Sequence, residues 1–207
     1  MYKAVLLLVA ATRLAGQVPD QLTPHQVRVE AASYRGKQAV RLNSASDSLQ
    51  TYALVKNATF HNGSIDVDLA GAPAAGTFAG ARGFIGIAFR IQGDKFEYIY
   101  LRPTNGRADD QVRRNHSTQY AAQPDFDYAV LRRESPEKYE SYVDLEAGAW
   151  THYRITVQGT TARLFVNGAP QPCLIVSDLK LGDSTGGVAL WVGPGTEGYF
   201  AGLSIRE

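Results

Sequence analysis

Short runs of alternating hydrophobic and polar residues recur along most of the chain. In residues 64–69, the hydrophobic residues Ile65, Val67 and Leu69 alternate with two aspartates, and residues 151–157 repeat this pattern. A period of two places successive side chains on opposite faces of an extended strand. We therefore expect antiparallel strands that turn one face to a core and the other to water.

The run over residues 84–91 is hydrophobic at almost every position, which favours a central strand buried on both faces. Tight turns are expected at residues 92–95 and 158–161, because glycine tolerates the positive φ that short hairpins need. No window shows a clean helical period, apart from a short turn at residues 135–138. The predicted strands cover residues 27–33, 38–43, 52–56, 64–69, 84–91, 96–102, 139–144, 151–157, 162–166, 174–178, 188–192 and 200–206.

Many short strands separated by turn residues indicate an all-β fold, a two-sheet antiparallel jelly-roll sandwich. The Ala- and Gly-rich stretch at residues 70–81 is interpreted as a surface loop within this single domain. We assign the domain to residues 27–207, preceded by a linker over residues 18–26 with two prolines.

The first 17 residues have the character of an export signal. Lys3 gives a positive start, residues 4–12 form a compact apolar run, and small residues end it near Gly16. We expect removal of residues 1–17 and a secreted or periplasmic location. A lipid anchor is not expected, because Gln17 stands where a lipidated cysteine would be required.

Composition narrows the function classes. The chain has 207 residues, 44% of them hydrophobic, which is enough for one substantial core. Its formal net charge of +1 argues against nonspecific nucleic-acid binding, which relies on a broad positive field. No segment after the N-terminus has the roughly 20 apolar residues that span a bilayer. Cys173 is the single cysteine, so no intrachain disulfide forms.

The C-terminal half carries a recognisable pattern. It consists of Trp150-Thr-His-Tyr-Arg-Ile-Thr-Val, Ala162-Arg-Leu-Phe-Val-Asn-Gly, Gly187-Val-Ala-Leu-Trp-Val-Gly and Tyr199-Phe-Ala-Gly-Leu-Ser-Ile. This pattern resembles the concanavalin A-like superfamily, in its laminin G-like and 3-keto-disaccharide hydrolase branch. The resemblance implies the sandwich fold but not an activity, because the fold hosts lectins, hydrolases and lyases.

Two catalytic patterns of that superfamily are missing. The β-glucanases carry a Glu-x-Asp-x-x-Glu strand, whereas here only Asp66 and Asp68 alternate. The alginate-lyase branch carries Gln-x-His, whereas this chain has Asn115-His-Ser. The resemblance therefore implies neither activity.

The most unusual part of the chain is the polar segment over residues 97–142. It is long for a loop in a compact sandwich, which favours a functional role. Arginine forks bind carboxylates, sulfates or paired hydroxyls, amides both donate and accept, and tyrosines offer flat faces to sugar rings. The predicted ligand-binding residues are Tyr98, Tyr100, Arg102, Asn105, Arg107, Arg113, Arg114, Asn115, Gln119, Tyr120 and Tyr139.

Candidate catalytic groups lie in the same segment. His116 is its only histidine and titrates near neutral pH, and Glu97, Asp109 and Glu140 are the carboxylate candidates. Asp110 and Asp127 extend the set of acids from which a hydrolytic pair would be drawn. No transition-metal site is expected, because no His or Cys stands beside His116 at ligand spacing. No cofactor is predicted, and calcium on Asp109, Asp110 or carbonyls stays open.

Three functions remain as hypotheses. The first is an exported carbohydrate-binding domain that recognises a glycan or modified sugar, or an acidic small molecule. The second is a glycoside hydrolase, acting on a glycoside or 3-keto sugar, which needs two carboxyl groups about 5–9.5 Å apart. The third is a laminin G-like adhesion domain, in which the polar segment serves only as a partner surface and its aspartates pair with its own arginines. Convergence of His116 with a carboxylate would favour the second, and an open groove of Tyr and Arg the first.

Overall fold

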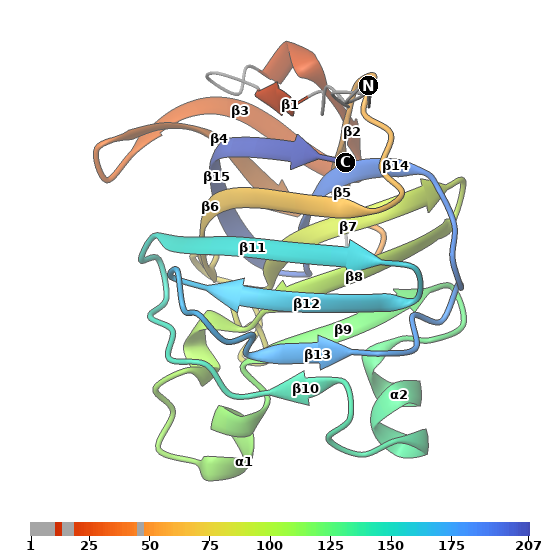
Figure 1. Ribbon diagram of the computed structural model, residues 1–207. Helices are drawn as coiled ribbons and strands as arrows, with labels where there is room; N and C mark the ends of the chain where they lie inside the picture. The colour runs from red at the N-terminus through yellow and green to blue at the C-terminus, as the bar shows by residue number, and fades with distance from the viewer. Residues whose placement is uncertain (1–10, 14–18, 45–47) are drawn as a thin grey trace.

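The computed structural model describes residues 11–13, 19–44 and 48–207, and it shows two antiparallel β-sheets packed face to face (Figure 1). The first sheet has the strand order β13-β12-β11-β6-β15-β4-β3, with β1 paired to β15, and the second has the order β10-β9-β8-β7-β14-β5-β2. The strands of the first sheet are β1 (Ala11–Arg13), β3 (Val27–Tyr34), β4 (Lys37–Ser44), β6 (Gly63–Pro73), β11 (Thr151–Gln158), β12 (Thr161–Val166), β13 (Leu174–Val176) and β15 (Thr196–Arg206). Those of the second are β2 (Leu22–His25), β5 (Tyr52–Val55), β7 (Ile85–Gln92), β8 (Lys95–Leu101), β9 (Thr118–Gln123), β10 (Glu140–Ser141) and β14 (Gly187–Val192). The predicted jelly-roll sandwich is confirmed.

The hydrophobic core lies between the two sheets, as the alternation of hydrophobic and polar residues along the strands predicted. Ile65, Val67 and Leu69 of β6 are at most 1% exposed, and Tyr153 and Ile155 of β11 are fully buried beside them. Strand β7 is the middle strand of the second sheet, between β8 and β14, as its hydrophobic run predicted. Both expected hairpins form, joining β7 to β8 and β11 to β12.

The polar segment is structured and is not one long loop. It contains a 3-10 turn at Pro103–Asn105, helix α1 (Gln111–Asn115), strand β9 and helix α2 (Tyr128–Glu134). The strand predicted over residues 139–144 is reduced to the two residues of β10. Figure 1 shows both helices beside β10, at one end of the sandwich. These elements extend the second sheet and place the polar residues along its edge.

Two boundaries differ from expectation. Within the expected linker, Leu22–His25 forms β2, an edge strand paired with β5, and Leu22 is 5% exposed. Within the expected loop at residues 70–81, the first residues continue β6 to Pro73, because β15 pairs with them. The predicted signal peptide lies outside the described residues except for Ala11–Arg13. In the described part of the chain, no helix has the length and apolar character needed to cross a membrane.

Candidate functional site

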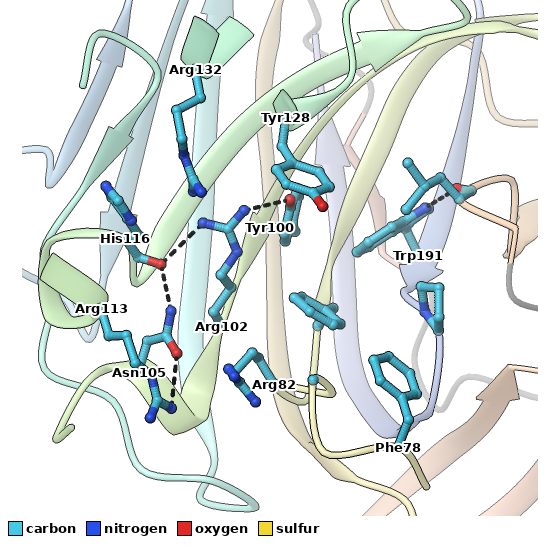
Figure 2. A pocket seen from close by; sticks show the side chains of 14 residues that line it. Phe78, Arg82, Tyr100, Arg102, Asn105, Arg113, His116, Tyr128, Arg132 and Trp191 are labelled. Carbon is cyan, nitrogen blue, oxygen red and sulfur yellow. Dashed lines mark hydrogen bonds between the residues drawn. The ribbon is translucent and has the colours of Figure 1, made fainter. Parts of the chain in front are cut away.

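Alternation along β8 separates a core face from an outer face. Ile99 and Leu101 point toward the first sheet, where the Tyr153 hydroxyl donates to the Ile99 carbonyl at 2.9 Å. Tyr100, and Arg102 directly after the strand, point away from that sheet into a pocket of about 610 Å³ (Figure 2). The pocket is lined by Leu49, Phe78, Gly80, Arg82, Phe84, Tyr100, Arg102, Asn105, Arg113, His116, Tyr128, Arg132, Trp191 and Pro194.

The side chain of Arg102 is held in place by hydrogen bonds on the polar side of the pocket. Its side chain is only 6% exposed, and Nη1 donates to Glu140 Oε1 at 3.0 Å and to the His116 carbonyl at 3.2 Å. Nη2 donates to the Tyr100 hydroxyl and to Gln119 Oε1, both at 3.0 Å. Because all four Nη protons are used, Arg102 holds its neighbours in place and has little left for a ligand.

Glu140 stands behind the pocket rather than in it. Its side chain is 2% exposed, and Arg132 of α2 grips it with a fork in which Nε donates to Oε2 at 3.0 Å and Nη2 donates to Oε1. Burial acts to raise the pKa of Glu140, but hydrogen bonds from Arg132 and Arg102 outweigh it and hold the pKa below its usual value. Glu140 is therefore an ionised anchor for two arginines.

His116 faces the same pocket from the end of α1. Nε2 lies 3.5 Å from Glu140 Oε2, and the side chain is 17% exposed. Burial lowers the pKa of His116; the Glu140 carboxylate opposes this, and the charges of Arg132 and Arg102 lower the pKa further. The pKa of His116 is therefore held below its usual value, which favours the neutral imidazole near pH 7.

Arg82 and Arg113 differ from the first two arginines. Arg82 Nη1 donates to the carbonyls of Ala79 and Ala81, at 2.7 and 3.0 Å, and Arg113 Nη2 reaches Asn105 Oδ1 at 3.4 Å. Among the described residues, neither guanidinium pairs with a carboxylate, whereas Arg102 and Arg132 share Glu140. The pocket therefore carries uncompensated positive charge.

The opposite wall is aromatic. The Tyr100 and Trp191 ring centroids are 4.9 Å apart, and Phe84 meets Tyr100 edge-on at 6.1 Å. Gly86 lies between Tyr100 and Trp191 in the sheet, and a Cβ there would lie 2.1 Å from the Ile99 carbonyl oxygen, so any larger residue would disrupt this wall.

Two further rings border the opening of the pocket. Phe78 is 51% exposed and Tyr128 is 39% exposed. Figure 2 shows the arginines on one side of the pocket and Trp191 and Phe78 on the other.

Five of the predicted site residues line this pocket, and three more support it from behind. The lining residues are Tyr100, Arg102, Asn105, Arg113 and His116. Gln119 and Glu140 bond Arg102, and Tyr98 stacks on Tyr100 with centroids 5.5 Å apart.

Glu97 does not reach the pocket. It faces the core, fully buried, where it accepts hydrogen bonds from the Tyr120 hydroxyl and from Leu181 N at 2.9 Å. The parity of β8 explains this, because Glu97 alternates with the pocket-facing Tyr98 and Tyr100. Tyr120 shares that core position, and Tyr139 donates to Asp178 at 2.7 Å, so neither tyrosine lines the site.

The remaining candidates lie on the surface outside the pocket. Arg107 pairs with Asp144 and Glu146, at 2.9 and 2.8 Å. Arg114 stacks on Tyr142, which is 44% exposed. Asn115 accepts from Gln111 within α1 at 2.8 Å, and Asp109 is exposed just before that helix.

The two other acids of the segment are helix caps. Asp110 accepts from Arg113 N at 2.7 Å, and Asp127 accepts from Ala129 N and Val130 N, each at 2.9 Å. Both therefore satisfy the free backbone donors at the start of a helix. In the described residues, no group of three or more His, Cys, Asp or Glu side chains could hold a metal ion.

Sequence reasoning missed most of the aromatic wall and two arginines. Phe78, Arg82 and Phe84 lie in or after the loop that was interpreted as surface, and Trp191 lies in the strand predicted over residues 188–192, to which no binding role was assigned. A usable signal was present, since Phe78 and Arg82 are the only aromatic and charged residues in a stretch of small ones. Tyr128 and Arg132 were noted as part of the polar segment but not assigned to the site.

Comparisons with known proteins agree with the fold. No family model matches the chain, and no curated protein matches it by sequence. Among solved structures, a carbohydrate-binding module of Bacillus subtilis (CBM66) has a TM-score of 0.60 at 11% identity, covering 89% of this chain and 94% of that one. A putative glycosyl hydrolase of Parabacteroides distasonis has a TM-score of 0.56 at 11% identity, covering 96% and 99%.

A third similar structure is the exoplasmic/lumenal domain of VIP36 in a form bound to Ca²⁺ and Man3GlcNAc. Its TM-score is 0.53 at 11% identity, and the alignment covers 94% of this chain and 86% of that one. At these identities, the likeness concerns the arrangement of strands. Together with the two antiparallel sheets, it shows that the chain has the concanavalin A-like jelly-roll sandwich fold.

Proposed function

We propose that this protein is an exported, non-catalytic carbohydrate-binding domain, and that the pocket beside β8 holds the sugar. The observation that carries the proposal is the composition of the pocket. Aromatic rings on one wall suit the apolar faces of a sugar, and guanidinium and amide groups on the other suit its hydroxyls. Secretion or a periplasmic location is part of the proposal, supported by the export-like N-terminus.

The same pocket argues against ordinary glycoside hydrolysis. That reaction needs two carboxyl groups facing the scissile bond, and no carboxylate is among the lining residues of this pocket. Glu140 is the nearest acid, but it is buried behind Arg102 and Arg132, with its pKa lowered. Glu97 is in the core and Asp109 on the surface.

The experiment also tests two alternative functions. Hydrolysis of a 3-keto sugar is the enzymatic one, supported by the putative glycosyl hydrolase of similar fold and by His116 in the pocket. His116 Nε2 lies 3.5 Å from Glu140 Oε2, and such convergence of His116 with a carboxylate favours an enzyme. A laminin G-like adhesion role would use the pocket's surroundings as a partner surface. Calcium is a further ligand to be tested, since one similar structure holds Ca²⁺.

The test combines a glycan array with a hydrolysis screen that includes 3-keto sugars. Replacing an exposed lining ring, in Phe78→Ala or Tyr128→Ala, should weaken sugar binding about tenfold or more, because burying an aromatic ring contributes about 1.5–3 kcal/mol. Tyr142→Ala is the matched control, since Tyr142 is 44% exposed but lies outside the pocket.

Each result has a defined meaning. Binding that depends on Phe78 and Tyr128 but not on Tyr142 supports the proposal. Turnover that is lost in His116→Ala would replace it with the enzymatic alternative. Binding of no glycan, or equal binding by all three aromatic variants, would refute it.

A further inference from the structure

Charge is distributed unevenly among the four pocket arginines. Arg102 and Arg132 share the Glu140 carboxylate, which is 2% exposed and makes contacts of 3.0 Å with each of their guanidinium groups. Arg82 and Arg113 have no such partner among the described residues. Four guanidinium groups therefore stand against one carboxylate, and the imbalance lies on the Arg82–Arg113 side.

The unpaired arginines also present free donors. Arg82 is anchored through Nη1 alone, which leaves its Nε–Nη2 edge without a partner in the described part of the chain. That edge is the one with which arginine binds a carboxylate or sulfate through two parallel hydrogen bonds. The Arg113 guanidinium makes a single hydrogen bond to the described residues, from Nη2 to Asn105 Oδ1 at 3.4 Å. Asn105 is itself fixed by donating to the His116 carbonyl at 3.1 Å.

The positive charges of these arginines repel one another across the pocket. Burial lowers the pKa of Arg82, and the charges of Arg113 and Arg102 lower it further. An anion between Arg82 and Arg113 would remove that repulsion.

The position of Arg82 connects the two walls. Figure 2 shows Arg82 between the Arg102 and Asn105 side of the pocket and Phe78 on the aromatic side. A ligand that reaches Arg82 with an anionic group therefore has the aromatic wall within reach of its ring.

We propose that the ligand is an acidic sugar, in which a carboxylate or sulfate group is held by Arg82 and Arg113 while the ring lies against the aromatic wall. The inference rests on the proposed carbohydrate-binding function and names its ligand class. It assigns Arg102 and Arg132 a positioning role, because their donors are directed at Glu140 and the pocket framework.

Isothermal titration with three matched probes tests this assignment. The probes are an oligosaccharide ending in a hexuronate, the same chain ending in the neutral hexose, and the same chain ending in a 6-sulfated hexose. We expect at least one acidic form to bind tenfold or more tightly than the neutral form, with an affinity that falls between 50 and 500 mM salt. Arg82→Gln and Arg113→Gln should each remove most of that preference, lowering the affinity for the acidic forms much more than the affinity for the neutral form.

Arg107→Gln is the matched control, since Arg107 pairs with Asp144 and Glu146 outside the pocket. It should leave the binding of all three probes unchanged. Equal binding of acidic and neutral probes, with Tyr128→Ala weakening both, would overturn the acidic assignment and leave the proposed function standing. If the protein bound none of the three probes and no other glycan, the proposed function itself would be refuted. An acid preference that survives in the Arg82→Gln/Arg113→Gln double variant would overturn the assignment to this pair.

Discussion

Arg102 shows how a single buried cation organises the pocket. Its four Nη hydrogen bonds join β8 to β9, β10 and the residue after α1. A buried ion pair adds little net stability, because the loss of hydration offsets the attraction, but removing one partner leaves an unpaired charge and costs about 3–5 kcal/mol. The pair with Glu140 therefore fixes the geometry of the pocket wall more than it raises stability, and it uses the Arg102 donors that would otherwise be free for a ligand.

His116 gives the pocket a pH response. Burial and the neighbouring arginines hold the folded-state pKa of His116 below its usual value, which favours the neutral imidazole near pH 7 in the free protein. An anion bound beside it would favour the imidazolium and raise its pKa. Binding would then take up a proton, and affinity for an acidic sugar should rise severalfold as pH falls from 7.5 to 5.5.

Titration calorimetry in buffers of different ionisation enthalpy measures that proton uptake directly. The charged groups around His116 are Arg102, Arg132, Glu140 and Glu137. His116→Gln should flatten the pH profile, because the variant has no imidazole to protonate. A profile of unchanged slope in His116→Gln would assign the response to another group.

At the scale of elements, two short helices position the lining side chains. Helix α1 carries Arg113, and α2 carries Tyr128 and Arg132. With five and seven residues, both are too short to be stable alone, so capping and side-chain contacts hold them. Asp127 caps α2 through two backbone N–H groups.

Asp127→Ala should therefore fray α2 and weaken sugar binding. Loss of an N-cap costs about 1 kcal/mol of helix stability. If sugar binding requires the folded helix, this cost lowers the affinity by up to about fivefold. Hydrogen exchange of residues 128–134 should accelerate, while the exchange of β11 and β6 stays unchanged. Glu134→Ala is the control, since Glu134 is an exposed α2 residue whose one ion pair with a described residue is to its neighbour Arg133. Fraying of α2 without any loss of affinity would show that Tyr128 does not contribute.

The elements differ in how far the sequence could predict them. The core strands β6, β7 and β11 were predictable because one face of each is plainly hydrophobic. Strand β9 was not, because Thr118–Gln123 is polar or small at most positions yet buried at all of them, its glutamines being satisfied by Arg102 and Tyr98. Strand β2 contains Pro24, which a sheet accepts only at an edge such as this one.

The site could be predicted only for the residues that lie close together in the sequence, in and after strand β8. Tyr100, Arg102 and His116 belong to the polar segment, and their types indicated ligand chemistry. Arg82 and Trp191 come from distant parts of the sequence and meet Tyr100 only because β7 and β14 pair next to β8. That adjacency is a property of the sheet order, which local patterns do not contain.

At the scale of the whole molecule, Glu97 connects the second sheet to the segment that crosses between the sheets. It accepts from Tyr120 of β9 and from Leu181 N, in the connection from β13 to β14, and Tyr120 in turn accepts from Lys180 N at 2.7 Å. Burial raises the pKa of Glu97 despite these hydrogen bonds. A raised carboxyl pKa contributes stability below the unfolded-state value and loses it as pH rises through the folded-state value.

Glu97→Gln should therefore improve in stability relative to the wild type as pH rises from 4.5 to 8, because the variant has no proton to lose. Each unit by which the folded pKa exceeds the unfolded one corresponds to about 1.4 kcal/mol in that difference. Urea unfolding at pH 5 and pH 8 measures it. The same variant should bind sugar like the wild type, since Glu97 lies on the core face of β8, opposite to Tyr100 and the pocket. A folded Glu97→Gln protein that had lost binding or turnover would return Glu97 to the site, and a pH-independent stability difference would show that Glu97 is already ionised at the lower pH.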